Sequence, residues 1–251
     1  MTAEEQILAK YERAQQHIEA LDLVLVSLQR PGTIERTDDS DRGTTTFQIF
    51  GLSEIPLSIP LLLGDILHNL RSALDHLIWK MVELSGQTPD EENCFPIFNS
   101  ARAYEENSPK RLKGVTREMA ARVDACRPYK EGNRRLWMLH RLNILDKHRF
   151  LLTACHAKLA HSWWEHATSE GRVLLSGSAP FPLSNGDILA TVETKHARSL
   201  ESFLIDVAIN EPEVVSGVPL VVLVKLLSSE VQIVINQFVP VLQLMAGNCW
   251  S

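Results

Sequence analysis

Three long stretches of this chain place an apolar residue at alternating intervals of three and four positions. The stripes run from Ile7 to Leu28, from Leu63 to Leu84 and from Leu220 to Met245. This spacing lines one face of an α-helix with apolar side chains, which a folded chain buries by packing helix against helix. The sequence therefore predicts a bundle of long amphipathic helices.

Residues that begin or end helices flank the three stripes: Pro31, Gly32, Ser58, Pro60, Gly86 and Gly247. Proline suits the first turn of a helix and glycine the position just after the last one, so these residues predict the helix ends. Pro240 lies inside the third stripe, where its ring is expected to kink the helix. Two shorter helices are predicted at 116–126, capped by Thr116, and at 131–147.

Short segments rich in β-branched and aromatic residues, separated by Gly, Pro, Asn and Ser, predict strands. They lie at 44–50, 149–154, 172–175, 187–194 and 202–209. The predicted fold class is therefore α+β, a bundle of long amphipathic helices with an inserted or packed antiparallel β-layer. We expect one composite domain over 1–251, helical over 1–148 and 216–247 and β-rich over 149–210, because no linker or repeat divides the chain.

Cysteine usage and hydropathy bear on the compartment. The four cysteines form no CxxC pair, and the first residues are polar, unlike a signal peptide. Charged residues and Pro240 interrupt the longest apolar stretches before they reach the roughly 18 residues of a membrane span. We expect a cytoplasmic protein that does not enter a membrane.

The charge is unevenly distributed. The chain carries a net charge of -6, but between Lys110 and Arg149 there are 12 basic and 4 acidic residues. Such a basic segment is a candidate docking region for a polyanion, and RNA is the candidate partner. The alternative is a solvated helical face whose cations pair with acids elsewhere in the chain.

The second stripe carries an unusual opposite face. At about 100° per residue, polar and aromatic side chains gather away from the leucines: Asp65, His68, Ser72, Asp75, His76 and Trp79. Arg71 lies at the flank, where Asp75 is placed for an i,i+4 ion pair. Histidine and arginine are typical of acid/base chemistry on phosphates. The alternative is a satisfied polar layer between helices.

A second segment, LHRLNILDKHRF, repeats these residue types with His140, Arg141, Lys147 and His148. Arg141 and His148 lie seven positions apart, hence on nearly the same helical face. The alternative is a basic helix end stabilised by the helix dipole.

Two resemblances follow from these residues. The pattern HNLRSALDHL, then FPI, then DKHR is similar to that of a broad set of bacterial and phage-associated proteins, which implies no particular activity. More remotely, Arg71 and His76 match the motif of an arginine, four to six residues and a histidine found in the HEPN superfamily of helical ribonucleases, and Arg141 to His148 matches it too. Ser72 stands where that family often has Asn.

The HEPN resemblance implies RNA cleavage without a metal, in which Arg71 would hold the phosphate and His76 would move protons, at sites often formed by two protomers. The candidate catalytic residues are Arg71, His76, His68 and Asp75. The candidate substrate-binding residues are Ser72, Arg134, Arg135, His140, Arg141, Lys147 and His148. No metal and no cofactor are expected.

Two other functions compete with the ribonuclease hypothesis. One is a non-enzymatic binding or defence-associated module in which the His, Asp and Arg cluster is a structural polar network. The other is a metal-dependent hydrolase using His68 and Asp75 or Asp65 with His140 or His148, although no familiar metal-ligand spacing is present. The long helices are also candidates for contact with a second copy of the chain.

Overall fold

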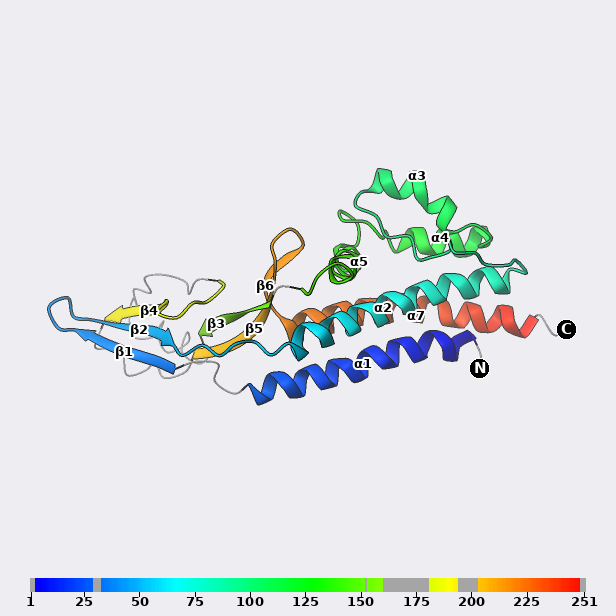
Figure 1. The fold of residues 1–251 in the computed structure, drawn as a ribbon. Helices are drawn as coiled ribbons and strands as arrows, with labels where there is room; N and C mark the ends of the chain where they lie inside the picture. Colours follow the sequence, from blue (N-terminus) through cyan, green and yellow to red (C-terminus); the bar gives the residue numbers. More distant parts are fainter. Residues whose placement is uncertain (1–2, 29–32, 152, 160–180, 194–202, 249–251) are drawn as a thin grey trace. The chain divides into compact units, whose positions relative to one another are not determined.

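The computed structural model describes residues 3–28, 33–151, 153–159, 181–193 and 203–248 (Figure 1). Contacts divide the chain into two compact units. The helical unit comprises the described residues of Met1–Leu21, Pro60–Leu151 and Val221–Ser251, and the strand unit those of Asp22–Ile59 and Leu152–Leu220. That the two fold together as one composite domain stays a prediction.

The three apolar stripes form the three long helices α1 (Ala3–Ser27), α2 (Ser58–Leu84) and α7 (Leu220–Asn248), shown in blue, cyan and orange to red in Figure 1. Their stripe residues make up most of the core of the helical unit. In α2, Leu63, Leu67, Leu70, Leu74, Leu77 and Met81 are all fully buried. The predicted helices are confirmed, because apolar periodicity is a local signal that packing only reinforces.

Polar side chains join α1 to α7 beside this core. The Tyr11 hydroxyl donates to Gln232 Oε1 at 3.1 Å, and Gln15 Nε2 donates to Ser228 Oγ at 2.5 Å. Hydrogen bonds of this kind fix the register between two helices, since a shift of one helix by a turn would leave the groups unpaired.

Three shorter helices follow α2 along the chain: α3 (Ala101–Arg111), α4 (Arg117–Ala125) and α5 (Arg134–Asp146). Each begins at a side-chain cap that accepts a backbone N–H of the first turn, from Ser100, Thr116 and Asn133 respectively. The predictions at 116–126 and 131–147 are confirmed as α4 and α5. Helix α3 was not predicted, because ARAYEENSPKR has no apolar period.

Helix α5 is attached to α7 through Glu230. Its carboxylate accepts from Asn133 Nδ2 at 2.7 Å and from Arg135 Nη1 at 3.3 Å. Asn133 thus caps α5 with its oxygen and contacts α7 with its nitrogen. This attachment positions the start of α5, the helix that carries His140 and Arg141.

The strand unit holds two antiparallel sheets. One has the order β1-β2-β4, formed by Thr33–Asp39, Thr44–Phe50 and Ile188–Glu193. The other has the order β3-β5-β6, formed by Thr153–Leu159, Phe203–Glu211 and Val215–Pro219. A small apolar cluster around Ile49, Leu183 and Leu189 packs inside this unit.

The strand predictions are partly confirmed. Strands β2, β4 and β5 lie where the sequence predicts strands at 44–50, 187–194 and 202–209. The prediction at 149–154 is wrong for residues 149–151, which are not in a strand, and β3 begins at Thr153. Strand β6 replaces the start of the helical segment predicted from 216, so α7 begins at Leu220.

Strand β1 and the segment 172–175 also differ from the sequence predictions or lie outside their test. Strand β1 was not predicted because TIERTDD is largely charged, and its side chains are mostly exposed. The strand predicted at 172–175 lies outside the described residues. The β-rich part also includes β1 and β2, which precede the predicted β-rich range of 149–210. The α+β class is confirmed.

Among the described residues, one helix passes a simple test of length and hydropathy for crossing a membrane. It is the Leu220–Leu244 part of α7, and 44% of its tested window is buried inside the protein. A buried core helix passes the same test, so this feature is weak evidence for a membrane span. The expectation of no membrane stays a prediction.

Candidate functional site

Arg71 and Asp75 together hold the backbone of Phe95. Arg71 Nη1 lies 2.8 Å from Asp75 Oδ1, and Arg71 Nη2 donates to the Phe95 carbonyl at 2.7 Å. The Phe95 amide in turn donates to Asp75 Oδ1 at 2.9 Å. The ion pair expected from the i,i+4 spacing is confirmed, and it also binds both backbone groups of a residue on another segment.

This arrangement is a polar layer in which Arg71 Nη2 and both backbone groups of Phe95 are hydrogen-bonded. Arg71 Nη1 has only its ion-pair contact with Asp75 and no hydrogen bond to the described residues. Arg71 is only 7% exposed and the Phe95 side chain is fully buried. Backbone groups beside a buried side chain need partners, and α2 supplies both of them here. The pair therefore fixes the segment that follows α2 and forms part of a cavity wall.

A cavity of about 210 Å³ lies against this segment, and we call it the arginine cavity. Its polar lining consists of Arg71, Cys94, Asn99, Arg111, His140 and Arg141. The rest of the described lining is residues 95–98 and Ile144, so none of the described lining residues is a carboxylate. Three guanidinium groups around one small space make it a candidate anion site.

The three arginines differ in their partners. Arg71 pairs with Asp75, and Arg111 Nη1 pairs with Glu92 Oε2 at 2.5 Å. Arg141 has no ion pair with any residue in the described part of the chain. Its charge is therefore the one in this lining that no carboxylate contact compensates.

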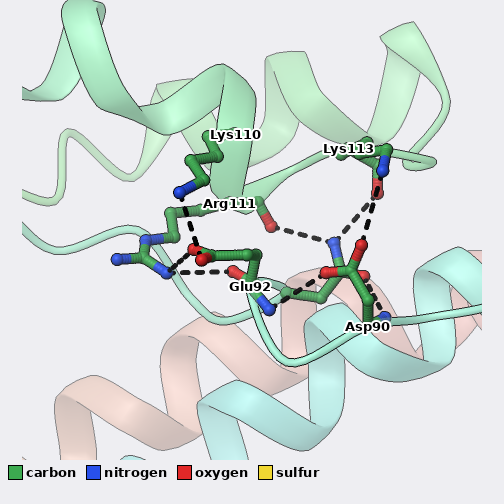
Figure 2. A network of polar contacts seen from close by, with 6 residues as sticks. Asp90, Glu92, Lys110, Arg111 and Lys113 are labelled. Atoms are coloured by element: carbon green, nitrogen blue, oxygen red, sulfur yellow. Dashed lines mark hydrogen bonds and ion pairs between the residues drawn. The ribbon is translucent and has the colours of Figure 1, made fainter.

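Arg111 belongs to a network that holds the end of α3 (Figure 2). Glu92 pairs with both Lys110, at 3.1 Å, and Arg111. Asn93 Nδ2 donates to the carbonyls of Arg111 and Lys113, at 3.3 and 2.9 Å. These carbonyls lie at the C-terminal end of α3, where backbone acceptors lack helical partners. The network thus fixes the position from which Arg111 reaches the cavity.

The side chain of His140 is largely buried in the arginine cavity and has positive charges around it. Burial, followed by the charges of Arg71, Arg141 and Lys147, lowers the pKa of His140 to about 3. Its Nδ1 is buried and has no hydrogen-bond partner within the described ranges. The imidazole is therefore neutral near pH 7, and a buried polar atom is left without a partner in a cationic cavity.

A second cavity, of about 490 Å³, lies on another side of α2. We call it the tryptophan cavity, and it is lined by Asp75, His76, Trp79, Lys80, Glu83 and Asn93. Arg71 and His76 thus line different cavities, because five residues turn a helix by about 140° beyond one full turn. Asp75 lines the second cavity and contacts Arg71 of the first.

The other candidates on α2 lie apart from both cavities. Asp65 and His68 are exposed, and Ser72 is half-buried. Asp146 of α5 packs against Gly64, where an added Cβ would lie 2.5 Å from its Oδ2. Burial and the nearby Asp65 charge raise the pKa of Asp146, and His68 opposes that rise. No group of three or more His, Cys, Asp or Glu suited to a metal is found among the described residues.

Of the candidate substrate-binding residues, the structure brings His140 and Arg141 together with Arg71. Arg134, Arg135, Lys147 and His148 are exposed, and Arg135 pairs with Glu230. Sequence analysis missed Arg111, Cys94 and Asn99. They come from segments without a periodic pattern, so only the basic count around Lys110 and the FPI motif pointed to them.

No protein-family model, no curated protein and no solved structure matches the chain. The HEPN resemblance, the RNA partner and the contact with a second copy therefore stay predictions.

Proposed function

We propose that this protein is a binding module that takes a phosphate group of single-stranded RNA into the arginine cavity. The observation that carries the proposal is the lining itself: three arginines and a neutral histidine, with no carboxylate. Guanidinium groups donate parallel hydrogen bonds to phosphate oxygens, which makes arginine the preferred residue for such sites.

Arg141 is the main contact in this proposal. Arg71 and Arg111 already have carboxylate partners, so they supply walls of fixed geometry. Arg141 has no counter-ion in the described part of the chain, and binding an anion would not break an existing ion pair. The unpartnered Nδ1 of His140 would gain a partner from a ligand hydroxyl or phosphate oxygen, according to its tautomer.

Exposed basic side chains on α5 extend this site. Arg134, Lys147 and His148 belong to the same helix or its end, and Lys147 is close enough to lower the pKa of His140. A chain of phosphates could follow these side chains, in agreement with the basic count of the 110–149 segment.

The first experiment measures binding of inorganic phosphate by NMR chemical-shift changes in wild type and Arg141→Ala. We expect binding in wild type and a loss of at least tenfold in the variant. The melting temperature should be unchanged, because Arg141 has no ion pair or hydrogen bond with the described residues. Arg102→Ala is the matched control, since Arg102 lies on α3, is 87% exposed in its side chain and pairs, among the described residues, only with Glu106. Equal phosphate affinity in Arg141→Ala and wild type would contradict the proposal.

The second experiment measures the salt dependence of binding to a single-stranded RNA. Each lost phosphate contact lowers the slope of log affinity against log salt by about 0.7 for a single strand. Arg141→Ala should therefore bind RNA more weakly, with a slope that is smaller in magnitude by about 0.7. Arg102→Ala should match wild type in both affinity and slope. An absence of RNA binding, with phosphate binding intact, would leave a phosphate site for a smaller ligand.

A metal-independent ribonuclease is the second candidate function. The observation in its favour is that Arg71 and His140 line one cavity, which places a cation and an imidazole around the same space. Cleavage of RNA in chelator that is lost in His140→Ala, or in His76→Ala as the HEPN motif implies, would establish it. Binding without cleavage would favour the binding module.

A further inference from the structure

The tryptophan cavity is separate from the arginine cavity. Two of its side chains, Asp75 and His76, have polar atoms without hydrogen-bond partners among the described residues. Asp75 uses Oδ1 for both Arg71 and the Phe95 amide, and its Oδ2 accepts no hydrogen bond from the described residues. His76 has no hydrogen-bond partner in the same part of the chain. The cavity therefore offers a carboxylate acceptor beside a neutral imidazole with one donor and one acceptor.

The indole of Trp79 is fixed and yet accessible. Its Nε1 donates to Glu83 Oε1 at 3.1 Å, and Lys80 Nζ pairs with Glu83 Oε2 at 2.5 Å. Glu83 thus holds both side chains in place, while Trp79 remains 40% exposed. A large aromatic ring held by a hydrogen bond and still open to solvent is a suitable surface for stacking a planar ligand.

The local charge disfavours a cationic ligand. Burial, and then the charge of Lys10 on α1, lowers the pKa of His76, with Lys80 acting in the same direction and Asp75 opposing them. Glu83 is neutralised by Lys80, and the Asp75 charge is shared with Arg71. The two carboxylates of the lining are therefore compensated by Arg71 and Lys80, and a quaternary ammonium would gain little from the indole face there.

We propose that the tryptophan cavity binds a nucleobase, stacked on Trp79 and held at its edge by Asp75 and His76. An exocyclic amino group or ring N–H of the base would donate to Asp75 Oδ2, and the neighbouring acceptor of the base would receive the N–H of His76. A volume of about 490 Å³ is within the usual range for a small-molecule site. This inference does not depend on the arginine cavity, because the base needs no phosphate to occupy the site.

The test uses nucleosides, which carry no phosphate. Adenosine is compared with purine riboside, which has the same stacking surface but lacks the amino group, by saturation-transfer NMR and calorimetry. We expect adenosine to bind wild type and purine riboside to bind about tenfold more weakly, the usual order for one lost hydrogen bond to a charged group. Equal binding of the two would overturn the edge contact that the proposal requires.

Variants of the cavity provide the matched comparison. Trp79→Ala should weaken adenosine binding by roughly tenfold or more, whereas Trp79→Phe should retain most of it because the stacking face persists. His76→Ala should weaken the binding of adenosine and purine riboside alike, because the ring acceptor that would receive its N–H is present in both. Melting temperatures identify any variant whose loss reflects folding, and Trp79→Phe then serves as the folded reference.

Two results would overturn the proposal. The first is an absence of adenosine, cytidine, guanosine and uridine binding to folded wild type at millimolar concentration. The second is binding of choline in preference to every nucleoside, which would make the cavity a site for a cation. Arg141→Ala, which removes the proposed phosphate contact, should leave adenosine affinity unchanged, so failure of one site is distinguishable from failure of the other.

Discussion

The guanidinium of Arg71 donates to the carbonyl of Phe95 over 2.7 Å, although 24 positions separate the two residues in the chain. This bond connects the middle of α2 to the segment that lines the arginine cavity. Arg71 thus both stabilises the fold and lines the arginine cavity. A loss of binding in an Arg71 variant could therefore reflect a loss of stability.

Arg71→Ala is expected to destabilise the protein by about 3 kcal/mol, because it leaves the Phe95 carbonyl unpaired and Asp75 without its cation. Asp75→Asn should cost less, since an amide oxygen can still accept the Phe95 N–H. Urea denaturation of the two variants measures both values. If the free energy of unfolding of Arg71→Ala lies within about 0.5 kcal/mol of the wild-type value, the Arg71–Asp75 pair does not stabilise the fold.

Gly132→Ala is expected to destabilise the loop that leads into α5. An added Cβ would overlap the Arg127 carbonyl and lie 2.8 Å from Tyr129 Cε2, and a backbone atom cannot move aside cheaply. Gly86→Ala is the control, because Gly86 has a φ of +72° but open space around it, so its cost is only the roughly 1 kcal/mol of left-handed backbone. Thermal denaturation should rank Gly132→Ala as the more destabilised variant.

His140 is expected to make the protein sensitive to acid. Its pKa is about 3 in the folded protein and about 6.5 in an unfolded chain, so between these values the unfolded state binds a proton that the folded state does not. Stability is therefore lost as the pH falls, by about 3 kcal/mol between pH 7 and pH 4. The measurement is the difference between the pH profiles of unfolding for wild type and His140→Gln, in which this contribution is absent. Parallel profiles would contradict the assignment.

Phosphate is expected to raise the pKa of His140. An anion in the arginine cavity opposes the charges of Arg71, Arg141 and Lys147, which together with burial hold that pKa low. The same linkage means that phosphate should bind more tightly once His140 is protonated. NMR titration of the His140 imidazole with and without phosphate measures the shift, and chloride at equal ionic strength is the control. An unchanged pKa at saturating phosphate would place the anion elsewhere.

The sequence predicted the elements whose signals are local. The stripes of α1, α2 and α7, the Thr116 cap and the Arg71–Asp75 spacing all depend on residues within a few turns of one another. The polar-layer alternative for α2 is also supported at Arg71 and Asp75, whose side chains hold Phe95.

The arrangement of the cavities was beyond the reach of the sequence. Arg71 lines the same cavity as His140 because of where α5 and the 94–99 segment pack against α2. No periodic pattern in the sequence specifies that packing. Arg111 was missed for the same reason, since it reaches the cavity from α3, a helix without an apolar stripe. Long-range packing, and not local propensity, determines which charged groups share a space.

Asp75 belongs to the lining of one cavity while its Oδ1 contacts the arginine of the other. A single carboxylate therefore acts as a common boundary between two compartments. An occupant that moved Asp75 would change the affinity for an occupant of the other cavity, and thermodynamic reciprocity would require the same factor in both directions. Such cooperativity, of either sign, would depend on one side chain on α2.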